Sequence, residues 1–174
     1  SGMCVEYDTN GGWQTTVGIL GAGKYAVRIS LSDDILAKYE ISSDSVQNAT
    51  LTVKKATLNV GIAQNSLHIV FGEDTNFSAT YNGFVNGENE SVLQGTLAFT
   101  CAYNTQKRAG NFPVTMSGLS SSNYEIVYAD DAVLTVDKAK VTITAKNQSA
   151  VYGEAFTLDE TAYEIKATSG KLLD

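Results

Sequence analysis

The stretch "NYEIVYADDAVLTVDKA", residues 123–139, repeats an earlier part of the chain, "KYEISSDSVQNATLTVKKA" at residues 38–56. Both contain Tyr-Glu-Ile, then Leu-Thr-Val after gaps that differ by two residues, and both end in a Lys-Ala pair. Two flanking pairs also match: "AGKYAVRIS" (22–30) with "AGNFPVTMS" (109–117), and "VFGE" (70–73) with "VYGE" (151–154). The spacing of 81 to 87 residues is longer than a solenoid repeat and indicates a string of compact β domains.

The Lys-Ala pairs suggest where each repeat begins and ends. If a repeat starts just after the pair, residues 57–139 form one complete unit. Residues 1–56 are then the back part of a preceding unit, and residues 140–174 are the front of a following one. We predict this division, although a phase with two units of about 87 residues also fits the chain length.

Alternating apolar residues predict short β-strands in residues 57–139. With further segments at about 57–63, 67–72 and 77–84, they give about seven strands, which favours an immunoglobulin-like β-sandwich. The stretch "NGENESVLQG" (86–95) predicts one helical turn with a polar cap, so a β-grasp arrangement with one short helix is the alternative. The alternating sets are Leu97, Phe99, Cys101 and Tyr103; Phe112, Val114 and Met116; and Tyr124, Ile126 and Tyr128.

The bulk composition is that of a mainly β protein. Gly, Thr, Ser, Val and Tyr are plentiful, and no 12-residue window has a convincing helical apolar period. A net charge of −7 disfavours nucleic acid as a partner, because such binding requires neutralisation of phosphates. No apolar run approaches the roughly 18 residues that cross a bilayer, so we expect no membrane insertion.

Several motifs together resemble the MBG-type repeats (the YGX type) of large bacterial surface adhesins. They are "VFGE", "YNGFVNGENESVLQG" (81–95), "AGNFPV" (109–114) and "LSSSNYEIVYADDAVLTVDKA" (119–139), with "KVTITAKNQSAVYGEAF" (140–156) opening the next repeat. Phe71 stands where the family usually has Tyr. Residues 1–56 lack a match to "GFVNG" and look more like a bacterial Ig-like repeat. The resemblance implies a secreted or cell-surface, non-enzymatic repeat with no catalytic residues.

Both connections between repeats pass from one strand to the next without Gly or Pro, so the linkers should be short and stiff. The apolar positions also change parity there. Leu51 and Val53 are odd but Leu58 is even, and Leu134 is even but Val141 is odd. Because a change of parity changes the buried face of a strand, we predict tandem β domains arranged end to end in an elongated monomer.

Three aromatic residues are candidates for ligand contact. Trp13 follows two glycines and, if exposed, is able to stack on a sugar ring. Tyr81 and Phe84 in "YNGFVNG" raise the same question. The more ordinary interpretation is that all three pack against their sheets, since each has the large apolar area typical of a core residue.

Other chemistry-bearing residues are few. His68 is the single histidine, which argues against a triad or a zinc site, so we expect it at a strand surface. We expect no cofactor, although the acidic loops 72–76, 86–91 and 128–132 carry the oxygen ligands of a structural calcium site. Cys4 and Cys101 are expected as free thiols, one near the surface and one buried, and Pro113 is expected at a sheet edge or bulge.

The function that fits these features is a non-enzymatic repeat region of an extracellular or cell-surface bacterial adhesin. It would act as an extended stalk, with weak adhesion to a host glycan, mucin or matrix protein. The alternative is a carbohydrate-binding module that accompanies a secreted glycoside hydrolase. Catalysis by the chain itself would need a cleft with convergent polar groups, for which the sequence offers no motif.

Overall fold

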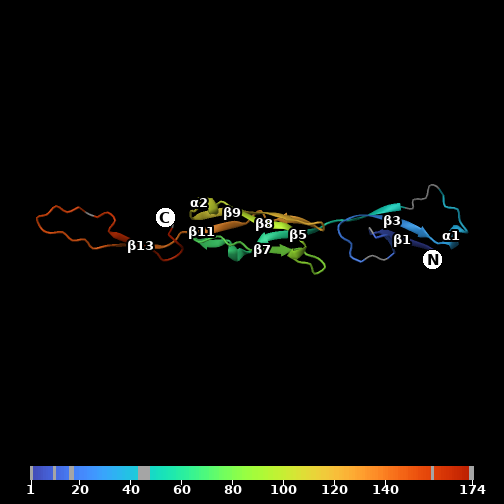
Figure 1. The fold of residues 1–174 in the computed structure, drawn as a ribbon, viewed down its shortest axis with the longest axis horizontal. Coiled ribbons are helices and arrows are strands. Elements are labelled where there is room, and N and C mark those ends of the chain that lie inside the picture. Colours follow the sequence, from blue (N-terminus) through green and yellow to red (C-terminus); the bar gives the residue numbers. More distant parts are fainter. Residues whose placement is uncertain (1, 10, 16–17, 43–47, 158, 173–174) are drawn as a thin grey trace. The chain divides into compact units, whose positions relative to one another are not determined.

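The computed structural model describes residues 2–9, 11–15, 18–42, 48–157 and 159–172. These residues are mainly β, as predicted, and the two α-helices found in them, α1 (Asp33–Leu36) and α2 (Tyr103–Gln106), have four residues each (Figure 1). The chain divides into two compact units. Unit 1 comprises Ser1–Leu58, Asn82–Gly95 and Leu119–Val127, and unit 2 comprises Asn59–Tyr81, Thr96–Gly118 and Tyr128–Asp174.

Unit 1 begins with a four-stranded antiparallel sheet. Its strands are β1 (Met3–Asp8), β2 (Trp13–Gln14), β3 (Gly23–Leu31) and β4 (Asn48–Val53), in the order β2-β1-β3-β4. α1 follows β3, and the Ser32 N–H donates to the Gly2 carbonyl at 2.8 Å, which brings the end of β3 beside the start of β1 (Figure 1). None of the described residues up to Thr57 is fully buried, so the side chains of this sheet are at most half-buried.

The middle of the chain contains seven strands in two sheets. One sheet has the order β10-β5-β7 and the other the order β6-β11-β9-β8, in which β6 runs parallel to β11. This two-sheet arrangement agrees with the predicted sandwich, and the helical elements between its strands have only three or four residues, too few to cover a sheet. The strands are β5 (Ala56–Ile62), β6 (His68–Val70), β7 (Ala79–Asn82), β8 (Gln94–Cys101), β9 (Gly110–Ser120), β10 (Tyr124–Tyr128) and β11 (Val133–Asp137).

The order of these strands is not that of the immunoglobulin constant domain. There the first strand lies at a sheet edge. Here the first of the seven strands, β5, has a neighbour on each side. The likeness to an immunoglobulin domain is therefore one of architecture, with seven short strands in two sheets, and does not extend to strand order.

All fully buried apolar side chains of the described residues come from this seven-strand region, between Leu58 and Val136. Those that lie in strands alternate, as predicted from the sequence, because successive side chains of a strand point to opposite faces. Tyr103 was predicted in the same strand as Cys101, but β8 ends at Cys101 and Tyr103 begins α2. Tyr103, Leu58 and Leu134 are 0% exposed. The core set is Leu58, Val60, Ile62, Leu67, Cys101, Tyr103, Phe112, Val114, Met116, Tyr124, Ala132, Leu134 and Val136.

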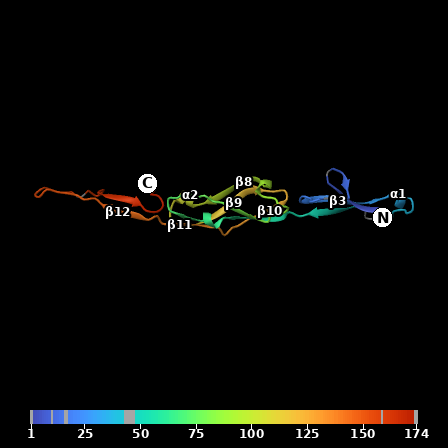
Figure 2. The ribbon, with the colours of Figure 1, turned by 90° about the horizontal axis from the view of Figure 1, so that it is seen from below.

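The last strands of the chain form an antiparallel pair in unit 2, β12 (Val141–Ala145) and β13 (Tyr163–Ala167) (Figure 2). Their register places Ile143 opposite Ile165, with Val141 opposite Ala167 and Ala145 opposite Tyr163. One face of the pair is therefore apolar. Ile143 is nevertheless 65% exposed, because no other described segment covers that face.

Two further expectations from the sequence are wrong, and one is confirmed in detail. Tyr39 to Ile41 were expected to repeat the strand at Tyr124, but they lie outside any strand; residues 43–47 of that repeat are outside the described residues. Pro113 was expected at a sheet edge or a bulge, but β9, where it lies, has a neighbour on each side, and Pro113 pairs with Val133 in an unbroken register with β11. The predicted helical turn is η2 (Glu90–Val92), where the Asn89 side chain accepts a hydrogen bond from the Ser91 N–H at 2.9 Å.

Candidate functional site

The connection between β4 and β5 is fixed by the loop that precedes β10. The carbonyl of Asn123 accepts the Ala56 N–H at 2.9 Å, and its side-chain oxygen accepts the Ala22 N–H, also at 2.9 Å. Lys55 Nζ donates to the Ser121 carbonyl at 2.7 Å. One short loop therefore binds two other segments of unit 1, at Ala22 and at the connection between β4 and β5.

The connection between β11 and β12 is fixed by the loop that follows β13. Thr168 N–H donates to the Lys140 carbonyl at 2.8 Å, and the Lys140 N–H donates to Ser169 Oγ at 2.9 Å. One turn further, the Lys171 N–H donates to the Phe71 carbonyl at 3.1 Å. This loop thereby joins the start of β12 to the "VFGE" turn after β6, within unit 2.

Two glycines allow this close approach. A Cβ at Gly72 would lie 2.3 Å from the Lys171 carbonyl oxygen, and a Cβ at Gly170 would lie 2.3 Å from the Phe71 carbonyl oxygen. Both residues also have positive φ, at +91° and +67°, which favours glycine. Gly72 of "VFGE" is therefore required twice, for the conformation of its turn and for the close contact with Lys171.

The buried tyrosine Tyr103 holds the same turn from the other side. Its hydroxyl accepts the Gly72 N–H at 3.1 Å and donates to the Glu73 carbonyl at 3.2 Å. The Glu73 carboxylate accepts the Val70 N–H at 2.8 Å and so closes the turn. A buried hydroxyl without hydrogen-bond partners would destabilise the fold. The Tyr103 hydroxyl therefore holds the turn in place, and the backbone groups of the turn supply the hydrogen bonds that this hydroxyl needs.

Tyr124 has the corresponding role in unit 1. Its hydroxyl donates to the Glu88 carboxylate and accepts the Val85 N–H at 3.1 Å. Burial and the hydrogen bond to Glu88 raise the pKa of the Tyr124 hydroxyl above its ordinary value of 10.0, although the Val85 N–H acts in the opposite direction. Tyr124 is therefore a neutral phenol that ties the loop before β8 to β10, and it is not poised as an acid or base at neutral pH.

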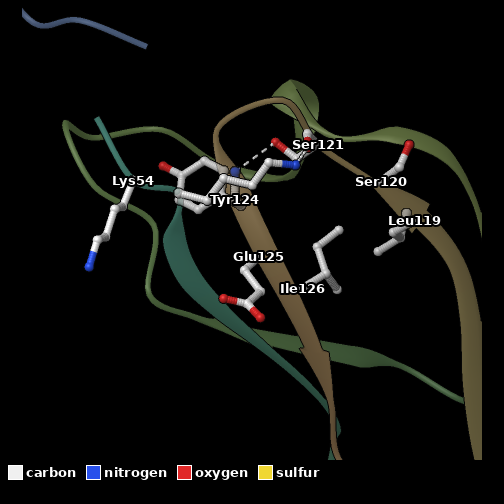
Figure 3. Close-up of a pocket in the computed structure, with 8 residues that line it drawn as sticks. Lys54, Leu119, Ser120, Ser121, Tyr124, Glu125 and Ile126 are labelled. Carbon is white, nitrogen blue, oxygen red and sulfur yellow. Dashed lines mark hydrogen bonds between the residues drawn. The ribbon is translucent and has the colours of Figure 1, made fainter. Parts of the chain in front are cut away.

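An open groove of about 680 Å³ lies beside Tyr124 (Figure 3). Figure 3 shows Lys54 at one side and Leu119 and Ser120 at the other, with Glu125 and Ile126 between them. Ser121 Oγ accepts the N–H groups of Asn123 and Tyr124 at 3.2 Å and so shapes the end of the groove. Its lining offers lysine ammonium groups, a carboxylate and serine hydroxyls beside the apolar Leu119 and Ile126, a set suited to hydrogen bonding with a polar ligand.

Trp13 lies in β2 and is half-buried. The guanidinium carbon of Arg28 is 4.1 Å from the centroid of the indole ring, and Arg28 Nε is 2.7 Å from the Glu6 carboxylate. One face of the ring is thus covered by a cation that a carboxylate holds in place.

The other two candidate aromatic residues are also half-buried. Tyr81 lies in β7. Phe84 packs edge-on against Tyr124, with ring centroids 5.4 Å apart and an interplanar angle of 81°. Neither Trp13 nor Phe84 lines the groove in Figure 3. Ligand contact by these three residues stays a prediction.

His68 and the two cysteines lie as the sequence predicts. His68 is exposed on β6, with its Nε2 atom 3.0 Å from Asp137 Oδ2. Cys101 is buried in the core, Cys4 is exposed, and both are free. Within the described ranges, no three His, Cys, Asp or Glu side chains gather closely enough to hold a metal ion.

Comparison with known families gives one match. Residues 58–135 match the model of the MBG domain (YGX type), which agrees with the resemblance seen in the motifs. MBG domains are repeat domains of surface proteins, and the family is not known to be catalytic. No curated protein and no solved structure matches the chain. No helix in the described residues has the length and apolar character to cross a bilayer.

Sequence reasoning missed the groove and the contacts at the connections. Lys54 and Glu125 lie in the two repeated stretches and Ser121 lies just before the second, and all three have the character of ordinary turn and strand residues. A signal was available in "LSSSN" (119–123), because serine and asparagine clusters are typical of loops that hydrogen-bond the backbone. The partners of that loop come from distant parts of the chain and leave no local pattern.

Proposed function

We propose that the chain is a non-enzymatic, tandem-repeat segment of a secreted or cell-surface bacterial adhesin, and that it acts as a stalk. The observation that carries the proposal is the docking of Gly170 and Lys171 on the Phe71–Gly72 turn. A flexible linker would leave these backbone groups in water. Backbone hydrogen bonds and glycine contacts instead hold the connection in one arrangement, which is what a spacer needs.

The match of residues 58–135 to a repeat domain of surface proteins supports the same proposal. So does the position of the first connection, where the Asn123 loop binds both Ala22 and Ala56. Both connections of the chain therefore have their own backbone hydrogen bonds. We propose that weak adhesion to a host glycan, mucin or matrix protein accompanies the stalk function, with the groove in Figure 3 as one polar surface available for it.

Small-angle scattering of the monomer tests the stalk. A compact globule of this length would have a radius of gyration of about 16 Å, and an unfolded chain about 44 Å. We expect a value clearly between these limits, with a distance distribution typical of an extended particle. A value near the lower limit would mean that the repeats fold back on one another, which would overturn the proposal.

A further inference from the structure

A cavity of about 460 Å³ at the second connection is lined by four cations. They are Lys107, Arg108, Lys138 and Lys171, which are four of the 12 lysines and arginines in a chain with a net charge of −7. Three separate segments supply them: the end of α2, the end of β11 and the loop after β13. The fold thus concentrates positive charge at one place on an acidic protein.

No ion pair of the described part of the chain includes any of the four cations. Asp137, next to Lys138 in the sequence, faces His68, and Glu73, two residues after Phe71, accepts the Val70 N–H. Within residues 2–9, 11–15, 18–42, 48–157 and 159–172, no carboxylate therefore offsets the mutual repulsion of these cations, and an anionic ligand would relieve it.

Two of the cations are held in place by aromatic rings. Lys107 Nζ is 4.9 Å from the centroid of the Tyr103 ring, and the guanidinium carbon of Arg108 is 5.2 Å from the centroid of the Phe112 ring. Both rings belong to buried core residues, so these cations sit on a rigid base. The cavity also has apolar walls, which include Phe71, Val141 and Leu172.

The four cations are not needed to form a connection between repeats, as the first connection shows. A cavity of about 420 Å³ lies at the first connection, and repeat alignment equates its Gly21, Ala22 and Ala56 with Arg108, Ala109 and Ala139. This first cavity is lined by a single cation, Lys54, and by the carboxylate of Glu88. The same repeat geometry thus forms with and without the cationic cluster, which makes the cluster a property of the second connection alone.

We propose that the second cavity binds an acidic saccharide, one with carboxylates on its sugar rings. Four ammonium and guanidinium groups complement carboxylates, and the apolar walls suit the C–H faces of a sugar ring. The volume lies in the range of small-ligand sites. The acidic surface elsewhere repels long polyanions, so a short saccharide fits better than nucleic acid. This inference deepens the adhesive part of the proposed function and rests on it.

Calorimetric titration of the full chain with a hyaluronan tetrasaccharide, which carries two glucuronate carboxylates, tests the proposal. The neutral tetrasaccharide of N-acetylglucosamine serves as the uncharged probe. We expect binding of the acidic probe alone, weakening as salt is raised because charge interactions are screened. The variant Lys138→Gln/Lys171→Gln should raise the Kd about tenfold or more, as expected for loss of a charge-assisted hydrogen bond.

The matched control is Lys24→Gln/Lys38→Gln, which removes the same charge from two exposed lysines of unit 1. It should leave the Kd within about twofold of the original, a change of well under 1 kcal/mol. The proposal is overturned if both double variants weaken binding equally, if the neutral probe binds as well, or if the acidic probe does not bind. These results are independent of the stalk, because scattering measures shape without any ligand.

Discussion

Tyr39 and Tyr124 occupy matching positions in the repeated Tyr-Glu-Ile sequence, yet one is 64% exposed and the other 2%. The difference lies in what surrounds them. Tyr124 has Phe84 against its ring and Val85 and Glu88 on its hydroxyl, all from the 82–95 segment. Residues 1–56 contain no counterpart of that segment. Identical residues therefore differ in burial because their partners come from elsewhere in the chain.

Replacement of Tyr103 by Phe should destabilise the protein by about 1–3 kcal/mol. The change removes the hydroxyl and leaves the Gly72 N–H and the Glu73 carbonyl without their buried partner. Urea unfolding measures the loss. As a control, Tyr152→Phe alters a fully exposed tyrosine and should leave the free energy of unfolding unchanged. Equal stability of both variants would show that the Tyr103 hydroxyl does not fix the turn.

The raised pKa of Tyr124 predicts a loss of stability at high pH. A group whose pKa is higher in the folded state than in the unfolded state stabilises the fold below the unfolded value. That contribution is complete below pH 10.0 and is lost as the pH rises through the raised pKa. Unfolding free energies measured between pH 8 and pH 11 should fall more steeply for the original protein than for Tyr124→Phe. Parallel curves would contradict this assignment.

Residue-level predictions from the sequence succeeded where the argument was local. The burial of Cys101, the exposure of Cys4 and the surface position of His68 follow from alternation and composition. The cationic cavity could not be predicted, because it forms only when residues 107–108, 138 and 171 meet. The spacing of these residues in the sequence does not indicate that the fold brings them together.

At the scale of single elements, alternation predicted the core with few errors. β5 and β9 bury the side chains that their parity selects, and so does β11, because a strand with one face on a core has a fixed register. Pro113 is the exception. Proline is usually excluded from inner strands because it has no N–H to donate to a neighbouring strand. Pro113 nevertheless lies in β9, between β11 and β8. The next N–H, that of Val114, donates to the Ala132 carbonyl at 2.9 Å.

Alternation along β11 gives a direct test of that core. Leu134 is 0% exposed and its neighbour Val133 is 43% exposed. We expect Leu134→Ala to destabilise the protein by about 2–5 kcal/mol, since it removes buried apolar area and leaves a cavity. Val133→Ala should cost less than about 1 kcal/mol. Similar losses in chemical denaturation would mean that β11 does not have one buried face.

At the scale of the whole molecule, the match of residues 58–135 to a repeat-domain family agrees with the repeat predicted from the sequence. The connections between strands β4 and β5 and between β11 and β12 are held by specific hydrogen bonds, which a short linker alone would not have. Their stiffness was expected from the lack of Gly and Pro between the strands. Their contacts were not, because Gly72 and Lys171 are 99 residues apart in the printed sequence. The division into three repeat segments stays a prediction.

The role of Gly72 in the second connection can be separated from its backbone strain. Gly72 and Gly153 occupy the same place in "VFGE" and "VYGE", with φ of +91° and +88°, but nothing lies within 4 Å of a Cβ at Gly153. Gly72→Ala should break the Lys171 to Phe71 hydrogen bond and speed amide exchange at Lys171 by more than tenfold. Gly153→Ala, with the same strain, should leave that exchange unchanged. Equal exchange in the two variants would refute the docking role.

The parallel pairing of β6 with β11 has a mechanical consequence. A pull on the N-terminal end of β6 and the C-terminal end of β11 would draw the two parallel strands in opposite directions along their length. The bonds of Thr135 to Leu67 and of Phe71 to Asp137, at 2.9 and 2.8 Å, are then sheared together and are not peeled apart one by one. This strand pair therefore resists a pull along its length through several hydrogen bonds at once.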